Sequence, residues 1–128
     1  MKANDLRIGN YYMFADYDGI VYRQVKQIKY NEFGLLSDYD GVNFDICIPI
    51  PITEEWLLKF GFYYQSSDKN YVVKSKQENN NSIKKIDGDW CYNNDYSDAS
   101  CYFVRELRYV HELQNLYYAL NEEELTIK

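Results

Sequence analysis

Few side chains in this sequence could carry out chemistry, and the strongest candidates are its histidine and its thiols. His111 is the only histidine, and the three cysteines are Cys47, Cys91 and Cys101. A Cys–His hydrolase needs its histidine beside a thiolate and an orienting group, and the spacing brings no such group together. No CxxC pair is present for zinc binding or thiol–disulfide chemistry. We therefore expect no catalytic residues, and a histidine that is hydrogen-bonded locally beside an apolar helix face.

Acidic residues gather beside glycines, where they could bind a cation or simply form turns. Asp-Tyr-Asp-Gly occurs at 16–19 and again at 38–41, and 87–89 reads Asp-Gly-Asp. The pattern resembles part of a calcium loop but lacks the third oxygen ligand and the glutamate at the twelfth position. A two-metal hydrolase would need a lysine or histidine held against the acids, and Lys84 and Lys85 are near only in sequence. We expect acids at hairpin tips, with no bound metal and no cofactor.

A small group of cations precedes the last helical pattern. Arg105 and Arg108 flank Leu107 at a predicted strand-to-helix junction, where backbone N–H groups favour an anion. Stacking on nearby aromatic rings would complete a nucleotide-like pocket. The alternative is that both arginines pair with surface acids such as Glu106 and Glu112. The candidate ligand-binding residues are Trp90, Tyr92, Arg105, Arg108, Tyr109, His111 and Asn115.

The composition narrows the class of protein. The chain has 128 residues, of which 46% are hydrophobic, so it can bury one ordinary core and disorder is not expected. A net charge of −6 argues against general nucleic-acid binding, where lysines and arginines replace counterions on phosphates. No stretch is apolar enough to cross a membrane, and, because no apolar run follows Lys2, we expect no signal peptide. We expect a cytoplasmic protein with free thiols, not bound to membrane.

The elements that must position these residues indicate a single α+β domain over 1–128. Residues 1–50 are strand-rich. We expect about four short antiparallel strands between residues 6 and 48, of which the last is 42–48, and these strands could curl into a small SH3-like barrel. Two prolines make 48–53 an extended connector. Thr53 then predicts the N-cap of a helix over 54–60, which Gly61 ends.

The second half of the sequence continues in the same α+β pattern. Strands and helix follow one another without a βαβ alternation. The apolar spacing after Arg108 predicts the clearest helix of the chain. The predicted elements are a hairpin of 62–65 and 70–74, a loop at 75–82, strands from Ile83 and through 90–92, a central strand at 101–107, a helix at 109–120 and a terminal strand at 125–127.

Two strings resemble a known family. PITEEWLLKFGF at 51–62 and YVHELQNLYYALNEEELTI at 109–127, with LRIGNYY at 6–12, are similar to small proteins encoded in Bacteroidota genomes and their phages and mobile elements. Residues 63–105 are outside this resemblance. The family has no established activity, so the resemblance implies no functional residues. It implies a bacterial or phage cytosol and a role in host–phage conflict.

Three functions compete on this basis. The first is a non-enzymatic binding protein that sequesters a nucleotide-like signalling ligand, favoured by 15 tyrosines and the absence of catalytic groups. The second is an acidic interaction module that inhibits a host protein as a nucleic-acid mimic, although its acids are interspersed with lysines. The third is a metal- or Cys-dependent hydrolase. A chain this aromatic could also form homo-oligomers through a tyrosine-lined face.

Overall fold

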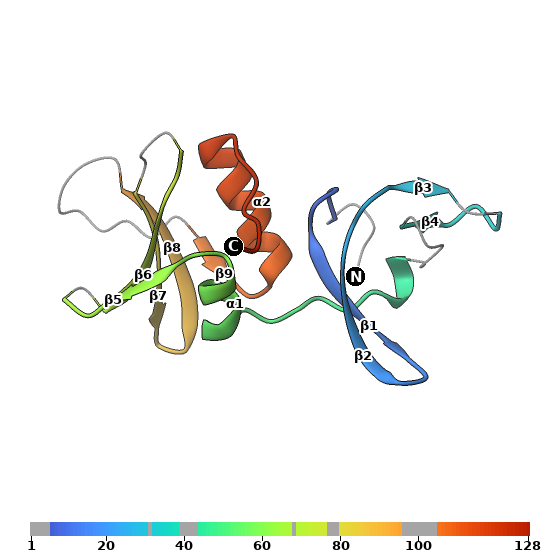
Figure 1. The fold of residues 1–128 in the computed structure, drawn as a ribbon, viewed down its shortest axis with the longest axis horizontal. Coiled ribbons are helices and arrows are strands. Elements are labelled where there is room, and N and C mark those ends of the chain that lie inside the picture. Colours follow the sequence, from blue (N-terminus) through green and yellow to red (C-terminus); the bar gives the residue numbers. More distant parts are fainter. Residues whose placement is uncertain (1–5, 31, 39–43, 68, 77–79, 96–104) are drawn as a thin grey trace. The chain divides into compact units, whose positions relative to one another are not determined.

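The computed structural model of the chain describes residues 6–30, 32–38, 44–67, 69–76, 80–95 and 105–128 (Figure 1). The fold is α+β, as the sequence predicts, with antiparallel strands and two α-helices. The chain divides into two compact units. One consists of Met1–Pro51 and Tyr109–Asn115, and the other of Ile52–Arg108 and Leu116–Lys128. A single domain over 1–128 stays a prediction.

The first unit contains two small antiparallel sheets. Its strands are β1 (Tyr11–Asp16), β2 (Gly19–Gln24), β3 (Lys29–Tyr30) and β4 (Leu36–Ser37). Strand β1 pairs with β2 across the predicted turn at 16–19, where Asp18 N–H donates to the Asp16 carboxylate at 2.8 Å. Gly19 has a φ of 121°, which a side chain would strain. Four short strands are thus present in the described part of this unit, although the strand predicted at 42–48 is not among them, and they form no closed barrel.

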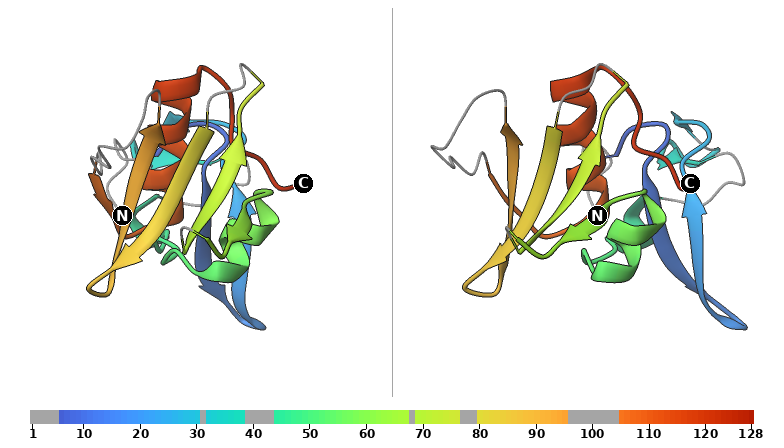
Figure 2. Two further views of the ribbon diagram at one scale, coloured as in Figure 1. Left: turned by 90° about the vertical axis from the view of Figure 1, so that its left-hand side faces the viewer. Right: turned by 60° about the vertical axis from the view of Figure 1, so that its left-hand side comes forward.

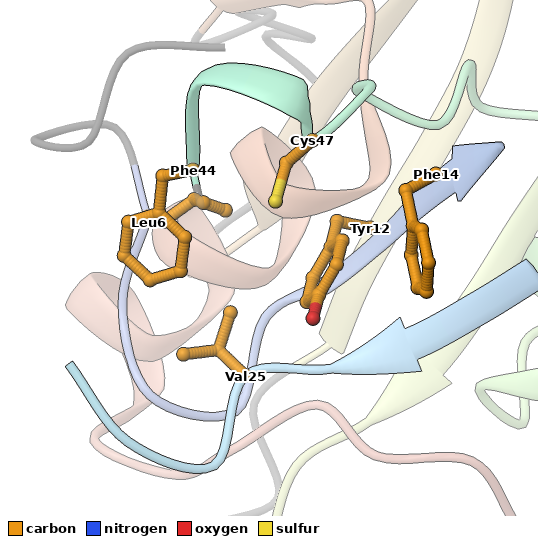
Figure 3. Close-up of a cluster of buried hydrophobic side chains, with 6 residues drawn as sticks. All are labelled: Leu6, Tyr12, Phe14, Val25, Phe44 and Cys47. Carbon is orange, nitrogen blue, oxygen red and sulfur yellow. The ribbon is translucent and has the colours of Figure 1, made fainter. Parts of the chain in front are cut away.

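The core of this unit consists of six side chains that Figure 3 shows facing one another: Leu6, Tyr12, Phe14, Val25, Phe44 and Cys47. Alternate residues of β1 supply Tyr12 and Phe14, as one buried strand face requires. The expected strand at 42–48 is wrong where the structure describes it, because η2 (Phe44–Ile46) is a 3₁₀ helix. Phe44 and Cys47 are three residues apart, so the 3₁₀ turn places both side chains on the same side. In a strand, residues three apart face opposite sides.

Asp38 corrects the expectation of acids at exposed turn tips. Its side chain is 3% exposed and accepts hydrogen bonds from Tyr12 Oη at 2.7 Å, Lys26 N at 2.9 Å and Gln27 N at 3.1 Å. A buried carboxylate is tolerated when its oxygens are saturated in this way. The remainder of the second predicted turn, 39–41, lies outside the described residues.

Helix α2 (Val110–Asn121) contributes its first half to the first unit. Asn115 Oδ1 accepts from Arg7 Nε at 3.0 Å and from Asn10 Nδ2 at 2.9 Å. Gln114 accepts from Tyr11 N–H and donates to Gly9 O, both at 2.9 Å. These amides hold the helix against the turn before β1.

The second unit begins with helix α1 (Glu54–Lys59). Thr53 is its N-cap, as predicted, since its hydroxyl accepts from Trp56 N–H at 3.4 Å. Gly61 follows the C-cap with a φ of 93°, in the left-handed region that ends helices. Trp56 and Leu57 turn the apolar face of this short helix inward.

A five-stranded antiparallel sheet forms the body of this unit (Figures 1 and 2). The strands, in sheet order, are β5 (Tyr63–Gln65), β6 (Asn70–Lys74), β7 (Asn80–Ile86), β8 (Asp89–Asp95) and β9 (Arg105–Leu107). The predicted hairpin of 62–65 and 70–74 is confirmed as β5 and β6. The strand predicted at 101–107 is not central, because β9 pairs only with β8 among the described strands, and 101–104 lie outside the description.

The predicted loop at 75–82 is wrong at its end, where β7 begins. Asn81 lies fully buried in β7, and its side chain exchanges hydrogen bonds with the Asn121 amide at 2.9 and 3.3 Å and accepts from the Tyr92 hydroxyl. Through Asn121 the second half of α2 lies against one face of the sheet (Figure 2). A polar residue can therefore occupy a buried strand position, because its partners satisfy it.

The predicted terminal strand at 125–127 is also wrong. Leu125 is 1% exposed, whereas its neighbours Thr126 and Ile127 are exposed. Lys128 N–H donates to Lys59 O at 2.8 Å, so the chain end meets the last carbonyls of α1 instead of a strand edge. Helix ends leave such carbonyls unpaired, and this segment supplies one donor.

Candidate functional site

A pocket of about 450 Å³ lies in the second unit, between the start of α1 and strands β5 to β8. This volume is within the range of about 300–1,000 Å³ that small-molecule sites occupy. Its lining is formed by Ile52, Thr53, Glu54, Tyr64, Lys69, Tyr71, Lys85 and Trp90. The lining combines aromatic rings with charges of both signs.

Strand register explains why the rings meet. Tyr64 lies opposite Tyr71 between β5 and β6, and Lys85 lies opposite Trp90 between β7 and β8. Opposed residues of antiparallel strands share a face. The same face carries Ile83, which is fully buried beside Tyr71 in the register. The pocket is thus the solvent-accessible continuation of the buried sheet face.

Three aromatic side chains form a continuous row along the pocket. The ring centroids of Tyr64 and Tyr71 are 5.1 Å apart, with planes at 54°. Those of Tyr71 and Trp90 are 5.9 Å apart in an edge-to-face arrangement at 65°. Tyr64 remains 51% exposed, so one end of the row is open to solvent. Such rings offer flat surfaces on which a base or another planar group can stack.

The polar ends of two of these rings are bound within the unit. Trp90 Nε1 donates to Ile52 O at 3.1 Å, and Ile52 N–H donates to Arg108 O at 3.0 Å. The Tyr71 hydroxyl donates to the Glu54 carboxylate, and burial followed by this contact raises the pKa of Tyr71 above its ordinary value. The rings are therefore held in place before a ligand arrives, which lowers the entropy lost on binding.

Two lysines bring positive charge to the same pocket. Lys85 Nζ lies 5.5 Å from the centroid of the Trp90 ring, a cation–π contact. Lys69 is the last residue of the β5–β6 turn and has a φ of 56°, a left-handed conformation that costs a lysine about 1–2 kcal/mol. Neither lysine forms an ion pair with another residue in the described part of the chain. Both lysines line the pocket.

The structure places the predicted ligand-binding residues in several environments. Trp90 lines the pocket, whereas Tyr92, two residues along the same face, is fully buried and donates its hydroxyl to Asn81. Arg108 is exposed at the end of β9. Arg105 lies opposite Tyr92 in the register, and its side chain is outside the described part of the chain.

The other three candidates belong to the first unit. Tyr109 and His111 stack at 5.9 Å with planes 12° apart, and His111 is 5% exposed. Asn115 bonds Arg7 and Asn10. Of the predicted set, Trp90 lines the pocket, and ligand binding by all seven residues stays a prediction.

Sequence reasoning missed Tyr64, Tyr71, Lys85, Lys69 and Glu54 as pocket residues. The sequence does contain a signal that places Lys85 opposite Trp90. The Asp87-Gly88 turn connects Ile86 directly to Asp89, and this two-residue turn fixes Lys85 opposite Trp90. Glu54 is the first residue of α1, and the preceding connector at 48–53 places it at the pocket. No local sequence pattern indicates this placement.

The described residues contain no group of three or more acidic, histidine or cysteine side chains placed to hold a metal ion. Within the same residues, no helix has the length and apolarity needed to cross a membrane.

Fold and site together define a small α+β protein with an aromatic pocket that carries two lysines and one glutamate. Comparison with known proteins yields no matching family model, curated protein or solved structure.

Proposed function

We propose that this chain is a non-enzymatic binding protein that captures a small, planar, anionic ligand of the nucleotide type. The single observation that carries the proposal is the row of Tyr64, Tyr71 and Trp90 in one pocket with Lys69 and Lys85. Aromatic faces bind bases of any sequence by stacking, and ammonium groups bind phosphate oxygens.

Preorganisation supports binding at this pocket. The indole N–H of Trp90 and the hydroxyl of Tyr71 are engaged by Ile52 and Glu54, so neither ring must reorient to receive a ligand.

The resemblance of the two helical strings supplies the context of this proposal. We place the protein in the cytoplasm of a bacterium, encoded by a phage or mobile element, where it sequesters a signalling nucleotide during host–phage conflict. Sequestration requires tight binding and no chemistry, and a pocket built on paired strands suits it.

Thermal unfolding and titration calorimetry with a panel of nucleotides test the proposal. The panel contains cyclic mononucleotides, cyclic dinucleotides, nucleoside monophosphates and triphosphates, and nucleotide sugars. At a ligand concentration of a hundred times Kd, binding to the folded state adds about 2.7 kcal/mol of stability, which is a measurable shift in Tm. We expect such a shift with at least one member, and no shift with any member would refute the function.

Paired variants locate the site. Trp90→Ala removes the stacking surface and is expected to weaken binding at least about fivefold. Lys85→Gln removes a pocket charge, whereas Lys84→Gln removes the neighbouring charge, which the strand alternation places on the other face of the sheet. We expect weaker binding in Lys85→Gln alone. Equal effects of the two lysine variants would place the ligand elsewhere.

A further inference from the structure

The charge of the pocket differs in sign from that of the chain. The described lining residues include two lysines, Lys69 and Lys85, and one glutamate, Glu54, whose formal charges sum to +1 in a protein of net charge −6. A binding site selects the ligand charge that it can neutralise. The lining therefore suits a ligand with one negative charge better than a ligand with several.

Glu54 is the residue that sets this limit. Its carboxylate accepts the hydroxyl of Tyr71, the central ring of the aromatic row, and so stays at the wall where a stacked ligand would lie. Repulsion between like charges a few ångströms apart is appreciable even near a protein surface. Because Glu54 offsets one of the two lysine charges, each charge beyond the first on the ligand has no matching cation in the described lining.

Phosphate esters differ in the charge that they bring. A phosphomonoester carries about −1.5 to −2 at pH 7, because its second ionisation occurs near pH 6. A phosphodiester has no second ionisable oxygen and carries a single charge. A nucleoside triphosphate carries more charge than either.

We propose that the pocket selects nucleotides whose phosphate is a diester, as in a cyclic nucleotide, over phosphomonoesters and triphosphates with the same base, and that Glu54 is the specificity-determining residue. The inference rests on the proposed function, since it concerns the same pocket. It adds the chemical class of the ligand.

Calorimetric Kd values for one base in three forms test it: a cyclic monophosphate, the open monophosphate and the triphosphate. We expect the cyclic form to bind about tenfold more tightly than the open monophosphate, from one additional charge repulsion. In Glu54→Gln, which keeps an oxygen for the Tyr71 hydroxyl, we expect that ratio to fall to about twofold.

Glu55→Gln is the matched control. Glu55 is in the same first turn of α1 but pairs with Lys59 at 3.4 Å and does not line the pocket. Both substitutions remove one carboxylate from the start of the helix, so a general effect on α1 would appear in both. We expect Glu55→Gln to retain the preference of the natural chain.

A third measurement needs no variant. Lowering the pH through about 6 converts the monophosphate to its singly charged form, so its affinity should rise toward that of the diester. The diester serves as the control for the titratable groups that face the ligand, which are Glu54, Lys69, Lys85, Tyr64 and Tyr71.

The outcomes separate the two proposals. If no nucleotide binds, both the proposed function and the diester preference fail. If nucleotides bind but the open monophosphate binds as tightly as the cyclic form at neutral pH, the function stands and the preference is overturned. A Kd ratio that is equal in the natural chain and in Glu54→Gln overturns the role of Glu54. If Glu54→Gln does not fold, the pH dependence decides.

Discussion

At the scale of single residues, buried polar side chains in this protein are satisfied by partners distant in sequence. Tyr12 and Asp38 are an example, since the fully buried phenol donates to the carboxylate at 2.7 Å. Burial, followed by the hydrogen bond and the charge of Asp38, raises the pKa of Tyr12 above its ordinary value of 10.0. The phenol is therefore kept neutral in the folded state.

This raised pKa predicts a loss of stability at alkaline pH. Below pH 10 the phenol is neutral in both states, and above it the unfolded chain releases a proton that the folded chain retains. The free energy of unfolding should fall by up to about 1.4 kcal/mol per pH unit for this one group. Tyr12→Phe should remove that share of the slope, and should lower stability at neutral pH by about 1–3 kcal/mol, because Asp38 loses a donor.

Urea unfolding at several pH values measures both effects. Tyr17→Phe is the control, because Tyr17 is fully exposed in the β1–β2 turn. Tyr117, whose hydroxyl donates to Glu123 at 2.8 Å and whose pKa is also raised, contributes a parallel slope that Tyr12→Phe leaves in place. An alkaline slope that is identical in Tyr12→Phe and in the natural chain would contradict the assignment.

At the scale of elements, reciprocal amides attach the second half of α2 to β7. Asn81 and Asn121 are 40 positions apart in sequence, nearly or fully buried, and joined by two hydrogen bonds between their side chains. Asn121 also donates to Tyr117 O at 3.0 Å, so the pair is continuous with the helix backbone. A buried amide without its partner loses its hydration and gains nothing in exchange.

A double-mutant cycle measures this attachment. Asn81→Ala and Asn121→Ala should each lower the free energy of unfolding by about 1–3 kcal/mol. The double variant should cost less than the sum of the two, with a coupling of about 0.5 kcal/mol or more, since each single variant strands the same partner. If the changes in the free energy of unfolding are additive, the two amides act independently. Lys74→Ala, at an exposed position of the adjacent strand, is the control because it leaves the pair intact.

At the scale of the whole molecule, net charge is the dominant property. The chain carries −6 at pH 7, and its 14 lysines and arginines are distributed among 20 acids. Binding to duplex DNA depends on basic groups that release condensed counterions. In our proposal the described pocket lining, with a formal charge of +1, binds one small anion without giving affinity for a polyanion.

Gel-shift titration with duplex DNA follows from this balance. We expect no retardation at 50 mM salt with protein at about 10 μM, conditions under which a basic domain binds non-specifically. A matched titration of the small-nucleotide panel should still give binding, which distinguishes pocket recognition from general attraction to phosphate. Salt-sensitive binding to the duplex would contradict the argument.

The sequence by itself determined the local elements. Thr53 and Gly61 set the ends of α1, the apolar spacing after Tyr109 set α2, and the Asp-Gly turns set the hairpins. Each of these depends on backbone preferences within a few residues, so a single sequence is sufficient. The α+β class follows from the order of the elements.

Tertiary structure alone decided which polar residues are buried and which aromatic residues meet. The sequence predicts Asp38 in a turn and Asn81 in a loop, yet both are buried. Their hydrogen-bond partners are residues 11 to 40 positions away in the sequence. Trp90 and Tyr92 look equivalent in sequence, yet one lines the pocket and the other is buried. The reason is that burial and site geometry arise from the pairing of strands and the placement of connectors, which local preferences do not encode.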